Sequence, residues 1–207
     1  FMQEGDPNYY KGYSSFNTIT GETTPAILMT SAEIWLLRAE AALRGFTAES
    51  VQDCYKKGVQ TSFTQWGVGD ANSYLDSDKM PTDYKEYIPE SGGKDMKALI
   101  TITPKWDESA SPEVKLERII TQKWLACFPE SYEAWSEQRR TGYPRLFKVQ
   151  TNNSGGAIDT EIMIRRLPFS VDDAEKSPEQ YGFLKSALGG ADNGGTRLWW
   201  DTSKNNF

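Results

Sequence analysis

The chain has 207 residues, enough for one large domain or two small ones, and its 38% hydrophobic and 25% charged residues are ordinary for a globular protein. It contains no histidine, which excludes histidine-ligated metal sites and the catalytic mechanisms that rely on a histidine base. Its net charge of −6, without a stripe of Lys or Arg, argues against binding to nucleic acid or to anionic membranes.

The sequence shows neither a membrane-spanning segment nor a signal peptide. No run of 18 apolar residues is present, so the sequence predicts no membrane-spanning helix. The chain begins at Phe1, inside a polar and turn-rich stretch, and has no signal peptide. We therefore expect it to be processed, truncated or one piece of a longer protein.

The first strong helix follows the irregular residues 1–29. Thr30 and Glu33 have the spacing of a capping box, in which each side chain accepts a hydrogen bond from the other residue's backbone N–H. The segment that follows is apolar nearly all round, which is typical of a central helix. Glu40 and Arg44 are spaced to pair across one turn, and Gly45 predicts the end of the helix.

A second helix is predicted over residues 48–66, where apolar residues recur on one stripe from Val51 to Trp66. Gly58 and Ser62 are small and one turn apart, so they permit a close approach of another helix. Because only a few residues separate the two helices, we expect an antiparallel hairpin similar to a tetratricopeptide pair. One such pair does not demonstrate a repeat.

Residues 67–110 are broken by Gly and Pro and predict loops, with a short helix near 82–88. The acidic stretch 70–78 has oxygen-bearing side chains at alternate positions, but it lacks the glycine and final glutamate of a calcium loop. We therefore expect no metal site there. A loop region of this length is usually functional or packs on another part of the protein.

Two further helices are predicted in the second half of the chain. Ser111 is a suitable N-cap for a helix over 112–128, with Pro112 at its first position and Glu113 favourable for its dipole. A shorter helix over 130–140 follows. Cys54 and Cys127 both lie in predicted helices. They are either two buried thiols or a disulfide that joins the two helices.

The C-terminal part is less regular. We expect an extended segment over 162–169, a helix over 178–188 and a tail over 196–201. The tail contains Trp199 and Trp200, which should be buried because two adjacent exposed tryptophans favour aggregation. Together the patterns predict a mainly α fold of tetratricopeptide-like helical pairs, with long irregular loops and little β structure.

Several segments resemble conserved blocks of the SusD/RagB family, and they occur in the family's order across almost the whole chain. They are MTSAEIWLLRAEAA (29–42), YKKGVQTSF (55–63), IITQKWLACF (119–128), EAWSEQRRTGYP (133–144), RRLPF (165–169) and TRLWWD (196–201). Each block is weakly specific by itself, and 133–144 is the most specific. Family members are roughly twice as long or longer, so the chain resembles the C-terminal part, 1–207, of a SusD-like domain whose N-terminal part and lipid anchor lie outside it.

The resemblance implies a non-enzymatic protein without a cofactor, on the extracellular face of the outer membrane. It would bind oligosaccharides, or peptides in some branches, and deliver them to a SusC-like TonB-dependent transporter. The membrane would be contacted only through an anchor outside this chain. None of the family's ligand residues can be placed by motif, because they lie in variable loops.

Sugar binding requires aromatic rings against the C–H faces of the sugar and hydrogen bonds to its hydroxyls. Four tryptophans lie on predicted helices and are expected in the core: Trp35, Trp66, Trp124 and Trp135. The ligand-binding candidates are therefore aromatic residues of the irregular region. Trp106 is the first, and Tyr74, Tyr84 and Tyr87 follow.

Two other functions remain open from the sequence. A helical-repeat adaptor would bind a protein partner and no small ligand. A glycoside hydrolase would need a pair of carboxylates, and Glu130, Glu133 and Glu137 share one helical face. We expect that face to be solvated rather than catalytic.

Overall fold

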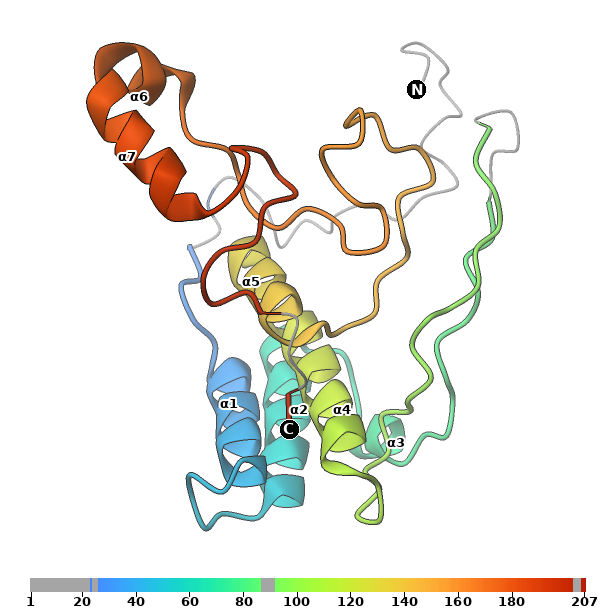
Figure 1. The fold of residues 1–207 in the computed structure, drawn as a ribbon. Coiled ribbons are helices and arrows are strands. Elements are labelled where there is room, and N and C mark those ends of the chain that lie inside the picture. The colour runs from blue at the N-terminus through green and yellow to red at the C-terminus, as the bar shows by residue number, and fades with distance from the viewer. Residues whose placement is uncertain (1–22, 24–25, 87–91, 203–205) are drawn as a thin grey trace. The chain divides into compact units, whose positions relative to one another are not determined.

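The computed structural model describes residues 23, 26–86, 92–202 and 206–207 (Figure 1). These residues form seven helices and no β-strand, and the chain divides into two compact units. Unit 1 contains residues 1–138, 143–147 and 207, and unit 2 contains residues 139–142 and 148–206. The predicted mainly α fold is confirmed. No helix in the described ranges is long and apolar enough to span a membrane.

Unit 1 is built on a hairpin of α1 (Ser31–Leu43) and α2 (Val51–Trp66). The capping box is formed as predicted: the Thr30 hydroxyl accepts from the Glu33 N–H at 3.1 Å, and the Glu33 carboxylate accepts from the Thr30 backbone. Glu40 pairs with Arg44 at 2.8 Å. Gly45, with φ of 77°, supplies the left-handed conformation that ends the helix.

The α1–α2 hairpin packs against α4 (Pro112–Ala126), and the three helices lie side by side (Figure 1). Gly58 of α2 faces Leu36 of α1, and a Cβ atom placed on Gly58 would lie 2.6 Å from the Leu36 Cγ. Because Gly58 has no side chain, the two helices lie closer together than any larger residue at that position would permit. Further core residues come from all three helices: Ala32, Ala39, Tyr55, Val59, Ile119 and Ala126.

A buried ammonium group lies between helices of unit 1. Lys123 of α4 is 1% exposed, and its Nζ lies 2.7 Å from Glu133 and 3.4 Å from Glu137, both on α5 (Ser131–Thr141), and 3.8 Å from Glu33. Burial alone would lower the pKa of Lys123, but Glu137 and Glu133 together outweigh it and raise that pKa. Burial raises the pKa of Glu33 despite the facing ammonium.

The irregular region between α2 and α4 differs from its prediction in two places. Residues 71–75 form a short helix, α3 (Ala71–Leu75), because the Asp70 carboxylate accepts from the backbone N–H groups of Asn72 and Ser73. The predicted helix at 82–88 is wrong for its described residues, since Tyr84 forms an antiparallel bridge with Met96. The two chain segments around that bridge form a paired arm.

Unit 2 contains α6 (Val171–Lys176), which was not predicted, and α7 (Pro178–Leu188), which was. Residues 164–169 form neither helix nor strand. Their place is fixed by Arg165, which binds both carboxylate oxygens of Asp201 at 2.7 and 2.5 Å. The expected burial of the tail is wrong for Trp199, which is 91% exposed. Trp200 is half-buried beneath the guanidinium of Arg139.

Both cysteines are free and buried, so the disulfide interpretation is wrong. Burial raises the pKa of Cys127 to about 12, which makes its thiol unreactive at neutral pH.

We expect Gly58→Ala to destabilise unit 1 although alanine favours helix formation. The added methyl group would overlap Leu36 and force α1 and α2 apart, at a cost of about 1–3 kcal/mol. Gly182→Ala on α7 is the matched control, because nothing lies within 4 Å of its Cβ position and helix propensity should stabilise it by about 0.5–1 kcal/mol. Urea denaturation measures both; a stabilised Gly58→Ala variant would contradict the close packing.

We expect Lys123→Ala to lower the free energy of unfolding by about 3–5 kcal/mol at pH 7, because it leaves buried carboxylates without their cation. The pKa of Glu33 is raised in the folded state, so this carboxylate takes up a proton more readily there than in the unfolded state. The stability lost in Lys123→Ala should therefore shrink as pH falls from 7 to 5. Urea titrations at both pH values measure this. Lys176→Ala, which removes an exposed pair with Asp172, should cost less than about 0.5 kcal/mol.

Candidate functional site

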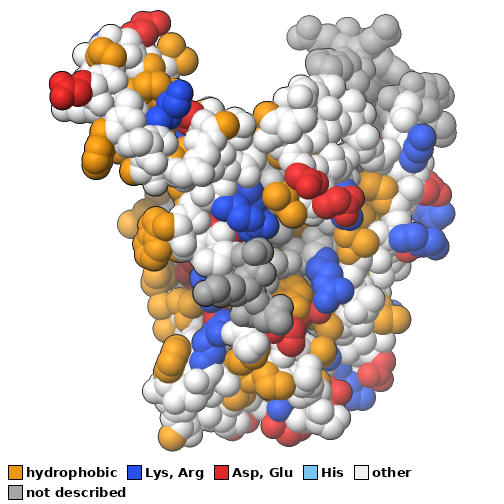
Figure 2. Space-filling view, in the orientation of Figure 1, with side chains coloured by type: hydrophobic (Ala, Val, Ile, Leu, Met, Phe, Trp, Pro, Cys, Tyr) orange, Lys and Arg blue, Asp and Glu red, His pale blue; other side chains and the backbone are white. Residues whose placement is uncertain are grey.

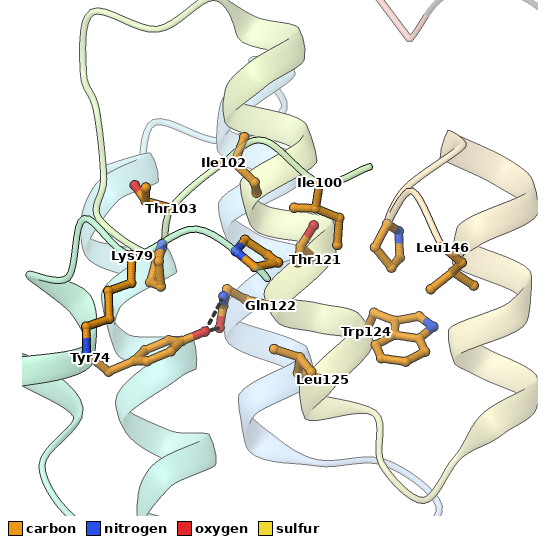
Figure 3. A pocket seen from close by; sticks show the side chains of 13 residues that line it. Tyr74, Lys79, Ile100, Ile102, Thr103, Thr121, Gln122, Trp124, Leu125 and Leu146 are labelled. Carbon is orange, nitrogen blue, oxygen red and sulfur yellow. Dashed lines mark hydrogen bonds between the residues drawn. The ribbon is translucent and has the colours of Figure 1, made fainter. Parts of the chain in front are cut away.

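A pocket of about 280 Å³ opens in unit 1 between α3, α4 and the irregular segments that flank them (Figure 3). Its lining is mostly apolar, with a few polar side chains. The lining residues are Tyr74, Lys79, Pro81, Ile100, Ile102, Thr103, Pro104, Thr121, Gln122, Trp124, Leu125, Pro144 and Leu146. An apolar pocket with few polar groups is the usual form of a small-ligand site.

Two aromatic side chains flank the pocket. Figure 3 shows the Tyr74 ring and the Trp124 indole on either side of Gln122 and Leu125. Both rings are half-buried, so each keeps surface that a ligand can contact. Phe63 supports the Tyr74 ring from behind, with 5.2 Å between the ring centroids.

Two neighbouring polar residues of α4 lie on the pocket wall. The amide of Gln122 donates to the Tyr74 hydroxyl at 2.9 Å, which fixes the orientation of both groups. Thr121 is 9% exposed, and its hydroxyl has no hydrogen-bond partner. The Thr121 oxygen is itself enclosed, and both ends of the Gln122 amide pair with the Tyr74 hydroxyl, so these polar groups of α4 are part of the packed pocket wall.

Buried side chains hold the opposite wall, residues 100–104, in place. The Tyr55 hydroxyl donates to the Pro104 carbonyl at 2.5 Å, and the Arg118 guanidinium donates to the Thr103 carbonyl at 3.0 Å. Burial raises the pKa of Tyr55 far above its usual range, so its hydroxyl stays a donor at any physiological pH. The wall is thus fixed to α2 and α4 rather than free to collapse.

The four predicted ligand residues are placed differently from one another. Tyr74 lines the pocket. Trp106 is 8% exposed and packs on Tyr55 with centroids 5.1 Å apart, while its indole N–H donates to Glu108 at 2.7 Å. Tyr84 is half-buried in the paired arm, 6.1 Å from the Phe147 ring. Tyr87 lies outside the described residues. Contact of any of them with a ligand stays a prediction, and burial favours Tyr74 over Trp106.

Four tryptophans expected in the core are each partly buried: Trp35, Trp66, Trp124 and Trp135. Trp35 packs against the core as expected. Sequence reasoning therefore missed Trp124 as a pocket residue, and it missed Thr121 and Gln122. Helical spacing places these residues on α4 but does not tell which side of the helix meets a void. The single available signal was the polar run Thr121, Gln122 and Lys123 within an otherwise apolar helical block.

The three glutamates of the predicted α5 face are not uniformly solvated. Glu137 is buried and pairs with Lys123, and Glu133 accepts a hydrogen bond from the same ammonium. Both carboxylates therefore act in the buried ion cluster. Within the part of the chain that the structure describes, no group of three or more Cys, Asp or Glu side chains could hold a metal ion.

Unit 1 is thus a helical hairpin packed on α4, with a mostly apolar pocket beside α3 and α4. The chain belongs to the SusD-like family, whose model, described as SusD and RagB outer membrane lipoprotein, matches residues 2–201. This confirms the resemblance found in the sequence. A search of the curated proteins returns no significant match.

Solved structures agree with the family. A SusD homologue from Bacteroides vulgatus is 66% identical over 99% of this chain, with a TM-score of 0.90. A chitin-binding SusD homologue from Flavobacterium johnsoniae is 45% identical over 87% of it, with a TM-score of 0.82. A SusD-like protein from Bacteroides thetaiotaomicron is 35% identical over 96% of it, with a TM-score of 0.87. The chain spans 41%, 37% and 42% of these three structures, respectively.

We expect Trp106→Ala to reduce the stability of the protein rather than to remove a contact with the ligand. Removing a buried indole that supports Tyr55 should lower the free energy of unfolding by about 3–5 kcal/mol. Urea denaturation and calorimetric titration separate the two effects. If affinity fell while stability was unchanged, Trp106 would be a ligand contact, as the sequence predicts.

Proposed function

We propose that the protein binds nutrient glycans without cleaving them and delivers them to a SusC-like TonB-dependent transporter. Three findings support the proposal: membership of the SusD-like family, a relative described as chitin-binding, and the pocket between Tyr74 and Trp124. The pocket is the observation that carries it, because it offers apolar surface and hydrogen-bonding groups together.

The pocket chemistry suits a neutral ligand with apolar C–H surface. The rings of Tyr74 and Trp124 can contact the C–H faces of a sugar, and the exposed Lys79 side chain of the lining can donate to its hydroxyls. At about 280 Å³ the pocket is at the small end of ligand sites, which fits one sugar residue better than a chain. Longer glycans would extend from it over the neighbouring surface.

Capture without cleavage is consistent with the carboxylates of α5. Cleavage of a glycosidic bond requires two carboxyl groups placed on either side of that bond, one of them protonated. Glu133 and Glu137 instead share the ammonium of Lys123. Neither lines the pocket.

We place the protein at the outer membrane, on its extracellular face. The family is described as an outer membrane lipoprotein, which supports a location at that membrane. Uptake of large glycans requires that the protein face the outside of the cell. Basic and acidic side chains are interspersed on the face drawn in Figure 2, which suits neither nucleic acid nor an anionic lipid surface.

A protein-binding role is the second candidate. Large hydrophobic side chains are exposed near α1, and Figure 2 shows such side chains gathered over that helix. They include Leu28, Met29, Ile34 and Phe46. Exposed apolar groups of this kind favour contact with another protein surface, such as the transporter. A peptide ligand, as in other members of the family, is the remaining alternative.

We expect the full-length protein to bind at least one neutral glycan in calorimetric titrations against polysaccharides, their oligosaccharides and peptides. Trp124→Ala should weaken that binding about tenfold or more, since it removes an aromatic wall of the pocket. Trp66→Ala is the matched control, because Trp66 is a half-buried helical tryptophan of unit 1 outside the pocket lining.

The outcomes distinguish the candidates. Binding of peptides alone would support the peptide alternative, and binding of neither class would overturn the proposed function. Glycan binding that Trp66→Ala and Trp124→Ala leave equally intact would place the ligand elsewhere in the protein.

A further inference from the structure

We propose that one face of α7 in unit 2 is permanently covered in the full-length protein by a segment of the same polypeptide that lies outside this chain. Phe183, Leu184 and Ala187 form this surface, the α7 face. The inference goes beyond the proposed function and does not rest on it. It is carried by exposed apolar side chains, by a helix with little stability of its own and by the length of a solved relative.

The α7 face is apolar and exposed. No residue of α7 is buried. Phe183 is 71% exposed and Leu184 is 41% exposed, and Ala187 is exposed as well. Successive residues of a helix are about 100° apart and one turn brings the chain back, so these three side chains form one surface. Figure 2 shows hydrophobic side chains at the surface around α6 and α7, and such surface marks a contact.

The other side of α7 is attached to unit 2 through Tyr181. The Tyr181 ring meets the Phe169 ring edge-on, with 6.2 Å between the centroids, and the Tyr181 hydroxyl donates to Asp192 at 3.0 Å. Lys185 lies over the same ring. This attachment uses the side of the helix that is turned away from Phe183. Within the described part of the chain, most of the α7 face is therefore left open.

Without a cover, α7 has little to keep it helical. It has 11 residues, and helices shorter than about 12–15 residues are marginal in water unless one side is packed. Gly182 is unfavourable in its interior, and Ser177 at its N-cap makes no side-chain hydrogen bond to the first turn. The α7 face therefore needs a cover whenever the protein is folded, and a partner that dissociates does not supply one.

A segment of the same polypeptide meets this condition. The Bacteroides vulgatus homologue matches 99% of this chain with a TM-score of 0.90, while the chain spans 41% of that homologue. More than half of the homologue thus lies outside the matched part, which is ample length to cover the surface of one short helix. A covalently linked segment stays beside α7 at any protein concentration, whereas a second copy of the chain would leave it on dilution.

Charge indicates the chemistry of the covering segment. Glu179 lies one turn before Phe183, at the edge of the α7 face, and is exposed. Among the described residues no cation pairs with it, and the lysine of α6, Lys176, pairs with Asp172 instead. The covering segment should therefore be apolar at its centre, against Phe183, with a Lys or Arg at its rim beside Glu179.

Thiol labelling of the full-length protein tests the cover. Cys54 and Cys127 are buried, so the reaction of Phe183→Cys and Lys185→Cys with a maleimide can be measured above that of the parent protein. Lys185 is exposed and lies on the other side of α7, which makes it the matched control. Phe183→Cys should react about tenfold more slowly than Lys185→Cys in the folded protein, since the cover must open first. In urea the two rates should be equal.

Hydrogen exchange of the unchanged full-length protein is the second measurement, because it needs no substitution in the α7 face. A covered helix exchanges its amide protons only when the cover opens. The amides of α7 should therefore exchange about a hundredfold or more slowly than those of an unstructured peptide of the same sequence. An uncovered helix of this length would exchange near the unstructured rate.

Slow labelling and slow exchange in the dilute, purified full-length protein would support the inference. Fast exchange of α7 would overturn it, and so would equal labelling rates in a Phe183→Cys variant whose urea midpoint matches that of the parent. Protection that is lost on dilution would assign the α7 face to a second copy, and protection that requires added transporter would assign it to that partner. Both results reject a cover within the polypeptide, and neither bears on glycan binding.

Discussion

The buried phenol of Tyr55 connects the regular and irregular parts of unit 1, and the pocket depends on it. Its ring lies in the core among α1, α2 and α4, while its hydroxyl reaches out to the Pro104 carbonyl. Trp106 then packs against the same ring. An extended segment without helix or strand partners has few other means of holding a fixed place, because its own backbone supplies no repeating hydrogen bonds. The pocket wall is rigid because a core residue fixes it.

The helices were predictable because their signals are local. Capping at Thr30 and Ser111 depends on residues within one turn, and apolar periodicity then predicts the buried face. The start of α2 was placed three residues early because its N-cap, Ser50, was not recognised. The short α3 was missed because Asp70, which caps it, lies in a stretch of oxygen-bearing side chains that resembles a metal-binding loop. The segment near Tyr84 was misassigned because its pairing partner, Met96, lies twelve residues away and no local pattern reports it.

The pocket was only partly predictable. An aromatic residue in an irregular segment is a reasonable ligand candidate, and Tyr74 does line the pocket. Trp106 has the same sequence character but is buried by a contact with Tyr55, which lies about fifty residues earlier in the chain. Thr121 has ordinary helical surroundings in the sequence. Its missing hydrogen bond is a property of three-dimensional packing alone.

The paired arm, formed by residues 83–86 and 92–98, is held differently from the helices of unit 1. One β-bridge joins its two sides, together with the ion pairs Lys85–Asp95 and Lys97–Asp83. The same two aspartates also accept from the backbone N–H groups of Glu86 and Ala98. Each exposed pair contributes at most about 1 kcal/mol, and salt screens it. We therefore expect the arm to open locally and to exchange its amide protons faster than the core helix α4. A protease added to the folded protein would cut the arm before it cut α4, and high salt would hasten that cut.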